Sequence, residues 1–508
     1  MKMTSLQGAP ILVVGAGIMG AGIAQVAAQA GHPVQLYDMR AGAARQAAAQ
    51  LGTTLDGLVA KGKLNADAVE ATLARIQPLE ALEELGKTGL VVEAIIENLD
   101  AKRALFQQLE GIVGADCVLA TNTSSISVTA VANGLQHPGR LVGMHFFNPV
   151  PLMKLVEVVS GLQTDAAVAD AIFELAKAWG KVPVHARSTP GFIVNRIARP
   201  YYAETLGLLH EQAATPQVLD ACLRAAGFRM GPCELMDLIG HDTNFAVTKS
   251  VYEANFFDKR YVPSLVQREM LDGGLLGRKS GRGFYRYPEG VPVLPVAVYE
   301  APATAREVTV HGEGAIAEHL ERAATTALAA QGWGPARASD SGWTGLAIDG
   351  ARLVLTDGRC AGDLVAALGS TDVAVFDRPL ALPMAGGGAL AFAVAEASST
   401  AWRSQATAWL SALGFAPLRV ADTPGLVVAR TVAMLINEAA DAVQQGVCTV
   451  DGADVAMKLG VNYPAGPFEW LVQWSATEVV ALLGALDAFY GGERYRVSPW
   501  LRRVARSA

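Results

Sequence analysis

The chain has 508 residues, 51% of them hydrophobic and 18% charged, with a formal net charge of −7. This length predicts about three to four domains with large cores, and a mildly acidic chain without blocks of Lys and Arg argues against nucleic-acid binding. No apolar run approaches the ~20 residues of a membrane-spanning helix, and no signal-peptide core precedes the first apolar run. The five cysteines are too scattered for a disulfide framework or a zinc site. We therefore expect a cytoplasmic protein with no membrane partner and no metal.

The first elements of the chain form a nucleotide-binding pattern. Residues 11–14 are a continuous apolar strand, residues 15–20 read GAGIMG, an Ala-rich helix follows to Ala30, and a second strand covers 34–37. The three glycines allow a tight turn, close approach of the backbone to a pyrophosphate, and packing of the helix on the strand. The helix N-terminus favours phosphate. The pattern predicts a dinucleotide-binding Rossmann domain, and a domain of this type that binds another nucleotide or none is the alternative.

Asp38 ends the second strand and indicates which dinucleotide binds. Its carboxylate can accept hydrogen bonds from the ribose hydroxyls and would repel a 2′-phosphate, so NAD is favoured over NADP. Arg40 stands two positions later and weakens that preference slightly.

Polar residues follow two further predicted strands, at 90–96 and 117–120. Glu97 follows the first strand, and a run of hydroxyl side chains at 121–125 follows the second. Residues at the carboxyl ends of strands line the nucleotide crevice of an open α/β sheet, so Ser124 is expected to face cofactor and substrate. A Ser/Thr-rich helix cap is the other interpretation of the same run, and both can hold.

One histidine and one glutamate stand in neighbouring apolar strands. Residues 141–147 and 154–159 are predicted strands, and the turn between them reads NPVP. If the strands fold back on each other, His145 and Glu157 face each other, and a buried carboxylate on an imidazole N–H makes a general base. From spacing alone, a core histidine with an accidental neighbour is an equally good interpretation.

The next hundred residues predict a helical domain. Residues 192–212 show apolar side chains at helical spacing, with Asn195 in the first turn. Further helices are expected after Thr215, at 231–240 and at 262–274, and a Gly-rich basic segment closes the domain at 276–287. The neighbouring pair His241-Asp242 is interpreted as surface or structural.

The second half repeats the first in a reduced form. Residues 288–305 are predicted to be a linker, and 306–418 contain a strand–glycine–helix unit without the third glycine of the fingerprint. Residues 422–430 then match 188–196, the numbers differing by 234, with Ala429 in place of Asn195. The sequence therefore predicts a duplicated helical domain, one active site in the first half, and a structural second copy.

Five segments of the first half resemble the L-3-hydroxyacyl-CoA dehydrogenases. They are GAGIMGAGIAQ, VVEAIIENLDAK, TNTSS, HFFNPVPLMKLVEVV and PGFIVNR, which occur in the order and approximate spacing of that family and cover residues 10 to about 287. The resemblance and the repeat together predict an α/β NAD-binding Rossmann domain (1–187), a helical domain (188–287), a linker (288–305), a degenerate Rossmann-like domain (306–418) and a second helical copy (419–508).

The resemblance also implies residue roles. His145 is the catalytic base, Glu157 its partner, and Ser124 and Asn195 contact the substrate hydroxyl and thioester region. The residues that match cofactor-binding positions are Gly15, Gly17, Ile18, Met19, Gly20, Asp38, Glu97, Lys102, Asn148 and Lys279. Lys61 and Lys63, on a predicted exposed turn, both align with the family's substrate lysine, and a solvated surface is the alternative for each.

The expected function is oxidation of the 3-hydroxyl of a (3S)-3-hydroxyacyl-CoA by NAD. The length and the degenerate second half resemble the phenylacetate-pathway enzymes that oxidise 3-hydroxyadipyl-CoA. A 3-hydroxybutyryl-CoA dehydrogenase is the first alternative, and a crystallin-like structural protein that lost catalysis is the second. No hydratase-sized segment precedes the Rossmann unit, which argues against the bifunctional type. The expected binding partner is the acyl-CoA thioester, and a homo-oligomer is possible on the sequence. The two helical copies are expected to pack on each other as an internal pseudo-dimer.

Overall fold

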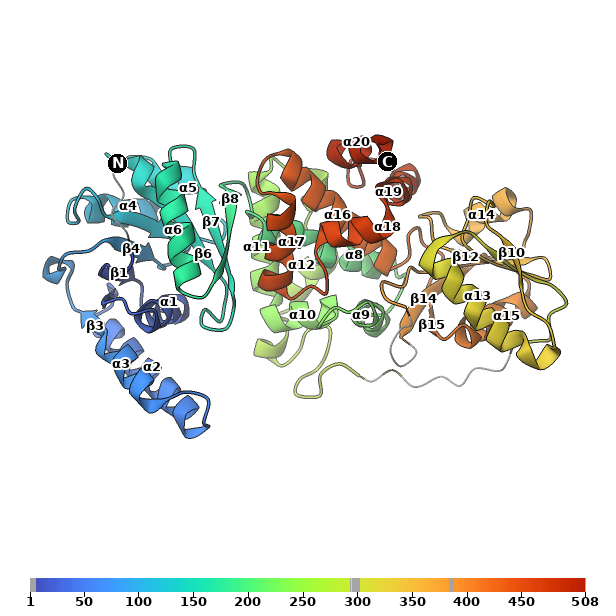
Figure 1. Cartoon of the computed structure of the whole chain (residues 1–508), viewed down its shortest axis with the longest axis horizontal. Helices are drawn as coiled ribbons and strands as arrows, with labels where there is room; N and C mark the ends of the chain where they lie inside the picture. The colour runs from blue at the N-terminus through green and yellow to red at the C-terminus, as the bar shows by residue number, and fades with distance from the viewer. Residues whose placement is uncertain (1–5, 293, 295–301, 383–387, 508) are drawn as a thin grey trace. The chain divides into compact units, whose positions relative to one another are not determined.

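The structure is a computed structural model of the chain, and it describes residues 6–292, 294, 302–382 and 388–507 (Figure 1). The chain divides into two compact units. The first contains Met1–Arg196 and Ala442–Val461, and the second contains Ile197–Asp441 and Asn462–Ala508. Part of the predicted linker, residues 293 and 295–301, lies outside the described residues.

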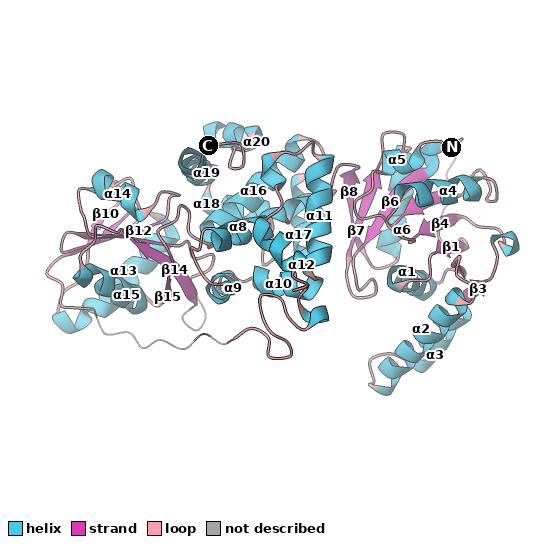
Figure 2. Cartoon of the chain, turned by 180° about the vertical axis from the view of Figure 1, so that it is seen from behind, coloured by secondary structure: helices cyan, strands magenta, loops and turns pink. Residues whose placement is uncertain are grey.

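The first unit is built on an eight-stranded sheet in the order β3-β2-β1-β4-β5-β6-β7-β8 (Figure 2). All neighbouring strands are parallel except β6 and β7, which are antiparallel. Strands with both faces covered by helices need nearly continuous apolar runs, as in the fully buried ILVV of β1. The strands are β1 Ile11–Val14, β2 Val34–Tyr37, β3 Ile76–Leu79, β4 Leu90–Glu93, β5 Val118–Thr121, β6 Leu141–Phe146, β7 Leu155–Ser160 and β8 Val182–Arg187.

Six helices of the first 180 residues accompany this sheet: α1 Ile18–Gln29, α2 Ala43–Ala60, α3 Ala66–Ala74, α4 Leu99–Glu110, α5 Val128–Ala132 and α6 Ala166–Ala178. Figure 1 shows α2 and α3 side by side, projecting from the sheet as a helical pair. A short helix, α7 Val194–Ile197, follows β8. One helix of the second half, α17 Val450–Val461, also belongs to this unit and packs on β7 and β8.

The second unit holds the first helical copy, a seven-stranded mixed sheet and most of the second helical copy. The first copy contains α8 Arg199–His210, α9 Pro216–Ala225, α10 Pro232–Ile239, α11 His241–Ala254 and α12 Leu265–Asp272. The second copy contains α16 Val428–Gln444, which continues into the first unit, α18 Pro467–Trp474, α19 Ala476–Tyr490 and α20 Pro499–Ser507.

The second sheet has the order β10-β9-β11-β12-β13-β14-β15. Its strands are β9 Val308–His311, β10 Ala336–Ala338, β11 Gly345–Ile348, β12 Ala351–Leu355, β13 Val373–Phe376, β14 Ala389–Val394 and β15 Ala416–Arg419, with helices α13 Gly314–Leu328, α14 Ala361–Leu368 and α15 Thr400–Ala412. The run β12 to β15 repeats the parallel, antiparallel, parallel pairing of β5 to β8. The predicted fold class, a Rossmann domain, a helical domain, a degenerate Rossmann-like part and a second helical copy, is confirmed.

Several predicted boundaries are wrong. The strand expected at 90–96 ends at Glu93, the last residue of β4, whose side chain forms a buried ion pair with Lys102. The helix expected over 192–212 is broken at Ala198 because Pro200 lacks an N–H to continue it. The helix expected at 262–274 begins at Leu265, where the Ser264 side chain accepts the N–H of Val266.

His241 is structural, as expected. Its ring is fully buried at the start of α11, and its Nε2 lies 3.0 Å from Asp237 Oδ1. Among the described residues no group of three or more metal-ligating side chains is close enough to hold an ion. In the same part of the chain no single helix is long and apolar enough to cross a membrane. One pair, α18 and α19, passes that test jointly on length and composition, although it bends by 99°.

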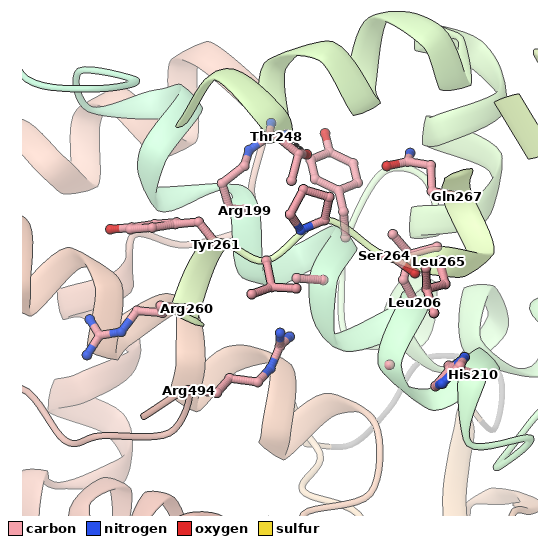
Figure 3. Close-up of a pocket in the computed structure, with 15 residues that line it drawn as sticks. Arg199, Leu206, His210, Thr248, Arg260, Tyr261, Ser264, Leu265, Gln267 and Arg494 are labelled. Carbon is pink, nitrogen blue, oxygen red and sulfur yellow. Dashed lines mark hydrogen bonds between the residues drawn. The ribbon is translucent and has the colours of Figure 1, made fainter. Parts of the chain in front are cut away.

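Reciprocal ion pairs join the two helical copies inside the second unit. Arg260 Nη1 lies 2.5 Å from Asp441 and 3.3 Å from Glu438, and the hydroxyl of Tyr261 donates to Glu438 at 2.5 Å. The residues 234 positions away make the mirror contacts: Arg494 Nη2 lies 2.8 Å from Glu204, and the hydroxyl of Tyr495 donates to Glu204 at 3.0 Å. Figure 3 shows Arg260 and Arg494 on the same side of a pocket of about 220 Å³.

Residues related by the repeat therefore make corresponding contacts: Arg260 and Tyr261 reach Glu438, and Arg494 and Tyr495 reach Glu204. Glu204 is fully buried and also accepts a hydrogen bond from Arg430 Nε at 2.6 Å. Burial would raise the pKa of Glu204, but the charges of Arg494 and Arg430 outweigh it and hold the pKa below its usual value.

Glu204→Ala and Glu438→Ala should each destabilise the protein, because each removes a fully buried carboxylate from a buried guanidinium. The expected loss in the free energy of unfolding is about 3–5 kcal/mol. The matched control is Asp357→Ala, which removes a carboxylate from the exposed Arg359–Asp357 pair in the same unit and should cost about 1 kcal/mol or less. Urea unfolding of the three variants checks this. Equal losses in all three would contradict a special role of the reciprocal pairs.

Candidate active site

The predicted contact between His145 and Glu157 is confirmed. The antiparallel register of β6 and β7 places the two residues directly opposite each other, on one face of the sheet. His145 Nδ1 lies 2.6 Å from Glu157 Oε2, and Glu157 is fully buried while His145 is 5% exposed. A carboxylate accepts but does not donate, so Nδ1 carries the proton and Nε2 is the basic ring nitrogen. The rings of Phe147 and Phe192 lie 4.5 and 5.9 Å from the imidazole.

The second oxygen of Glu157 holds the turn that follows β8. Its Oε1 accepts the backbone N–H groups of Ile193 at 3.1 Å and Val194 at 2.9 Å. These are the first free N–H groups at the start of α7, where a negative charge is favourable. The next residue is Asn195, so the carboxylate that orients His145 also places Asn195.

Ser124 and Asn195, predicted to share a site, are brought together. Asn195 Nδ2 donates to the backbone carbonyl of Ser124 at 3.3 Å. The end of the adjacent strand is tied to the dyad, because Asn122 Oδ1 accepts the N–H of Phe146, the neighbour of His145, at 2.8 Å. The Ser/Thr run is not itself the cap of α5, since Ser127 takes that position.

Glu97 Oε1 lies at the centre of the Ser/Thr run. It accepts the N–H of Ser124 at 2.9 Å, the N–H of Ser125 at 3.1 Å and the hydroxyl of Thr123 at 2.7 Å. The Ser124 hydroxyl lies 3.3 Å from the same oxygen. Burial would raise the pKa of Glu97, but the charge of Lys102 and these hydrogen bonds lower it below its usual value. Glu97 therefore stays ionised and fixes the backbone that carries Ser124.

Sequence reasoning missed Glu93. It is fully buried, its Oε1 lies 2.6 Å from Lys102 Nζ, and its Oε2 accepts the hydroxyl of Thr121 at 2.6 Å. The ammonium of Lys102 also lies 3.3 Å from Glu97, and its side chain is 1% exposed. Lys102 is thus held between two carboxylates, and its predicted contact with a cofactor stays a prediction. A carboxylate at the end of an apolar strand, nine residues before a lysine, was the signal that could have indicated the pair.

A cavity of about 610 Å³ lies over the glycine-rich turn, lined among others by Gly15, Gly17, Asp38, Arg40 and Leu105. A Cβ on Gly17 would meet no atom within 4 Å, so the backbone is open to a ligand there, and the first turn of α1 has no side-chain cap. A Cβ on the next glycine of the fingerprint, Gly20, would lie 1.7 Å from the carbonyl oxygen of Gly15, so only glycine permits this helix–strand contact. These features fit a dinucleotide pyrophosphate at the N-terminus of α1.

Asp38 lies at the rim of the same cavity. It accepts the N–H of Ala16 at 2.8 Å and pairs with Arg40 through two hydrogen bonds, Nε at 2.9 Å and Nη2 at 3.0 Å. The hydrogen bond from Arg40 is the main reason that the pKa of Asp38 falls to about 2. The carboxylate is therefore ionised at neutral pH, as an acceptor for ribose hydroxyls must be.

The other residues predicted to contact cofactor or substrate lie on several different elements. Ile18 and Met19 are in the first turn of α1, where Ile18 is 79% exposed, and Asn148 is exposed directly after β6. Lys61 and Lys63 are exposed on the turn between α2 and α3. Lys279 belongs to the second unit, where its Nζ lies 2.5 Å from Asp242.

The second half keeps the architecture of this site without its chemistry. Asp377 accepts the N–H groups of Val427 and Val428, as Glu157 accepts those of Ile193 and Val194. The register of the strands shows which residues of the two halves correspond. Asp377 occupies the position of His145, and Ala391 occupies that of Glu157. Asp357 occupies the position of Ser124, and Ala429 occupies that of Asn195. This agrees with the predicted single site in the first half.

The family models match nearly the whole chain. The model described as 3-hydroxyacyl-CoA dehydrogenase, NAD binding domain, matches residues 10–189, and the C-terminal domain of the same family matches 191–287 and 425–508. A reduced Rossmann-fold domain of 3-hydroxybutyryl-CoA dehydrogenase matches 353–424.

Some known proteins match this chain over nearly its whole length, and others match only about half of it. The 3-hydroxyadipyl-CoA dehydrogenase of Escherichia coli K12 is 44% identical, with 97% of each chain covered. A probable 3-hydroxybutyryl-CoA dehydrogenase of Deinococcus radiodurans is 43% identical over 54% of this chain and 99% of its own. A crystal structure titled 3-hydroxybutyryl-CoA dehydrogenase from E. coli K12 is 43% identical, covers 98% of both chains and has a TM-score of 0.88.

These matches cover the glycine fingerprint, the His145–Glu157 dyad and both helical copies. The protein belongs to the 3-hydroxyacyl-CoA dehydrogenase family and is an NAD-dependent oxidoreductase of that family.

Proposed function

We propose that this protein oxidises the 3-hydroxyl of (3S)-3-hydroxyadipyl-CoA to the 3-oxoacyl-CoA, as a step of phenylacetate catabolism in the cytoplasm. The observation that carries the proposal is the 44% identity over 97% of both chains to the E. coli protein named 3-hydroxyadipyl-CoA dehydrogenase. 3-Hydroxybutyryl-CoA is the alternative substrate, because a structure of nearly the same coverage carries that name. The intact dyad argues against a crystallin-like protein without catalysis.

In the proposed reaction His145 is the general base. Its Nε2 takes the proton of the 3-hydroxyl, and the ring then carries a positive charge that the buried Glu157 carboxylate stabilises at 2.6 Å. The NAD that the glycine-rich turn binds supplies the hydride acceptor for C3. Glu157 also holds the ring in the tautomer that leaves Nε2 basic, so the dyad is set before substrate arrives.

Ser124 and Asn195 are proposed to hold the substrate hydroxyl and thioester. Both lie on backbone fixed by a carboxylate, Ser124 by Glu97 and Asn195 by Glu157. Rigid placement of this kind lowers the barrier by positioning the reacting atoms. The proposed cofactor contacts are Gly15, Gly17, Ile18, Met19, Gly20, Asp38, Glu97, Lys102, Asn148 and Lys279, and either Lys61 or Lys63 is proposed to meet the anionic CoA moiety.

We also propose that the helical copies form an internal pseudo-dimer. The reciprocal contacts of Arg260 with Glu438 and of Arg494 with Glu204 support a twofold arrangement, and the unfolding of the Glu204 and Glu438 variants tests it. The corresponding domain division is 1–187, 188–287, a linker at 288–305, 306–418 and 419–508.

The substrate proposal predicts a preference for a terminal carboxylate. NADH formation measured with three (3S)-substrates separates charge from length: 3-hydroxyadipyl-CoA, 3-hydroxyhexanoyl-CoA of the same carbon number, and 3-hydroxybutyryl-CoA. A hydrogen bond to a charged group contributes ~1.5–3 kcal/mol, so kcat/KM for the adipyl substrate should exceed that for the hexanoyl substrate by roughly 10- to 100-fold. A higher value for 3-hydroxybutyryl-CoA would select the alternative.

His145→Gln should lower kcat at least ~100-fold, because the base is lost while the glycine-rich turn is untouched. Stopped-flow turnover and NADH fluorescence titration give kcat and the NADH dissociation constant separately. His185→Gln is the matched control, since that histidine is half-exposed on β8 of the same unit and should leave both values unchanged. Turnover near the wild-type value in His145→Gln would refute the assigned role.

Asp38→Ala should weaken the preference for NAD. The variant loses the ribose acceptor and releases Arg40 from its two hydrogen bonds, so the guanidinium becomes available to a 2′-phosphate. The ratio of kcat/KM for NAD to that for NADP should fall roughly 10- to 100-fold. Arg40→Ala is the control and should retain the preference, because the Asp38 carboxylate remains. An unchanged ratio in Asp38→Ala would show that discrimination lies elsewhere.

A further inference from the structure

A segment of the second half lies against the catalytic turn of the first half. Residues 442–461 belong to the first unit although they come from the second helical copy. The carbonyl of Val447 accepts the N–H of Arg187 at 2.9 Å, just before the turn that begins at Ser188. At the other end of the turn, Arg196 Nη1 donates to Gln445 Oε1 at 2.7 Å. The segment therefore brackets the turn that supplies the N–H groups to Glu157.

The same segment also lies close to the dyad carboxylate. Burial, followed by the neighbouring Glu157 charge, raises the pKa of the Cys448 thiol to about 12. The thiol is therefore neutral at physiological pH.

Gly460 is the point of closest approach. It stands in α17, and a Cβ built on it would lie 2.8 Å from Leu155 Cδ2 and 2.9 Å from Val194 Cγ2. Distances below 3.0 Å do not occur between well-packed carbon atoms, so any larger residue at this position must displace both side chains. The absence of a side chain on Gly460 leaves room for the side chains of Leu155 and Val194 to pack against the backbone of α17.

Both contacted residues are part of the support of Glu157. Leu155 precedes Glu157 by two positions on β7, so the two side chains point to the same face of the sheet. The N–H of Val194 donates to Glu157 Oε1 at 2.9 Å, and Val194 is followed by Asn195. A displacement at Gly460 is therefore transmitted to the carboxylate, to Asn195, and through Glu157 to His145.

We propose that α17 of the second copy is a positioning element for the reaction in the first half, with Gly460 as the positioning residue. It acts through Leu155 and Val194 on the His145–Glu157 hydrogen bond and on Asn195. This proposal rests on the proposed catalytic role of His145, and it extends the expectation that the second copy is structural. The retained helical copy then serves catalysis in the first half although it has no site of its own.

The test is Gly460→Ala in the full chain. We expect kcat for the acyl-CoA that the wild type oxidises best to fall at least ~10-fold, because a misplacement of about 1 Å costs up to ~100-fold. The NADH dissociation constant should not change. The deuterium isotope effect at C3 should rise, because misalignment slows the chemical step itself. A merely unfolded fraction would lower kcat without changing the isotope effect.

Two further variants sharpen the result. In Gly460→Ala with Leu155→Val, the second change removes the Leu155 Cδ2 atom that the new methyl would meet but leaves the contact with Val194 Cγ2, so part of the lost kcat should return. Gly484→Ala is the matched control, since Gly484 lies inside α19 of the same copy and a Cβ there meets nothing within 4 Å. It should retain wild-type kcat and isotope effect.

A readout independent of activity separates this inference from the proposed function. The short Nδ1–H hydrogen bond of His145 should give a low-field proton resonance that is absent in His145→Gln and weakened or shifted in Gly460→Ala. If the wild type oxidises no 3-hydroxyacyl-CoA, the proposed function fails, and this resonance still decides the inference. A wild-type resonance, kcat and isotope effect in Gly460→Ala would overturn the role of α17, as would a loss of kcat with an unchanged isotope effect.

Discussion

The carboxylate of Glu157 is the point on which the catalytic half of this protein depends. A fully buried carboxylate is costly unless hydrogen bonds replace its water. Here it receives three N–H groups, one from the His145 ring and two from the start of α7. One oxygen orients the base and the other holds the turn that carries Asn195. Burial raises the free-energy cost of the Glu157 charge and also constrains the positions of its hydrogen-bond donors. If a donor moved away, the buried charge would lose part of its compensation.

The second half shows that the anchoring role can be separated from the catalytic one. Asp377 is fully buried at the end of β13 and accepts the N–H groups of Val427, Val428 and Ala429. Burial is the main reason that its pKa rises to about 6. The turn after the last strand needs an acceptor in both halves, because its N–H groups would otherwise be buried without partners. In the second half the acceptor is a carboxylate at the position of His145, whereas the position of Glu157 is occupied by Ala391.

A second group of charges, in which Glu93 and Lys102 are buried and Glu97 is partly exposed, holds the backbone that carries Ser124. Glu93 and Glu97 hold Lys102 between them, and Glu97 in turn gathers the N–H groups that fix Ser124. Breaking such a buried pair leaves an uncompensated charge, so the lysine and its two carboxylates behave as one group. The structure thus places Ser124 and Asn195 by the same means, a carboxylate that accepts backbone N–H groups.

Local patterns were sufficient for much of this protein. Three features depend on residues that are close in sequence, so their spacing alone predicted them. They are the strand–glycine–helix unit, Asp38 at the end of β2, and the alternation that places His145 opposite Glu157. The repeat at an interval of 234 residues likewise predicted two helical copies. The expected role of the Ser/Thr run followed from its place after the end of a strand.

Tertiary structure alone decided what these elements contact. No periodicity indicated that Lys102 would be enclosed by Glu93, or that Asp377 would take over an anchoring role from a different strand position. Nor did the sequence show that α17 would leave its own copy and pack on β7 and β8, where Gly460 meets Leu155 and Val194. Such contacts join residues up to about 300 positions apart, and they depend on shape and on the cost of buried charge. Neither property leaves a local signal in the chain, because packing complementarity exists only once both surfaces are folded.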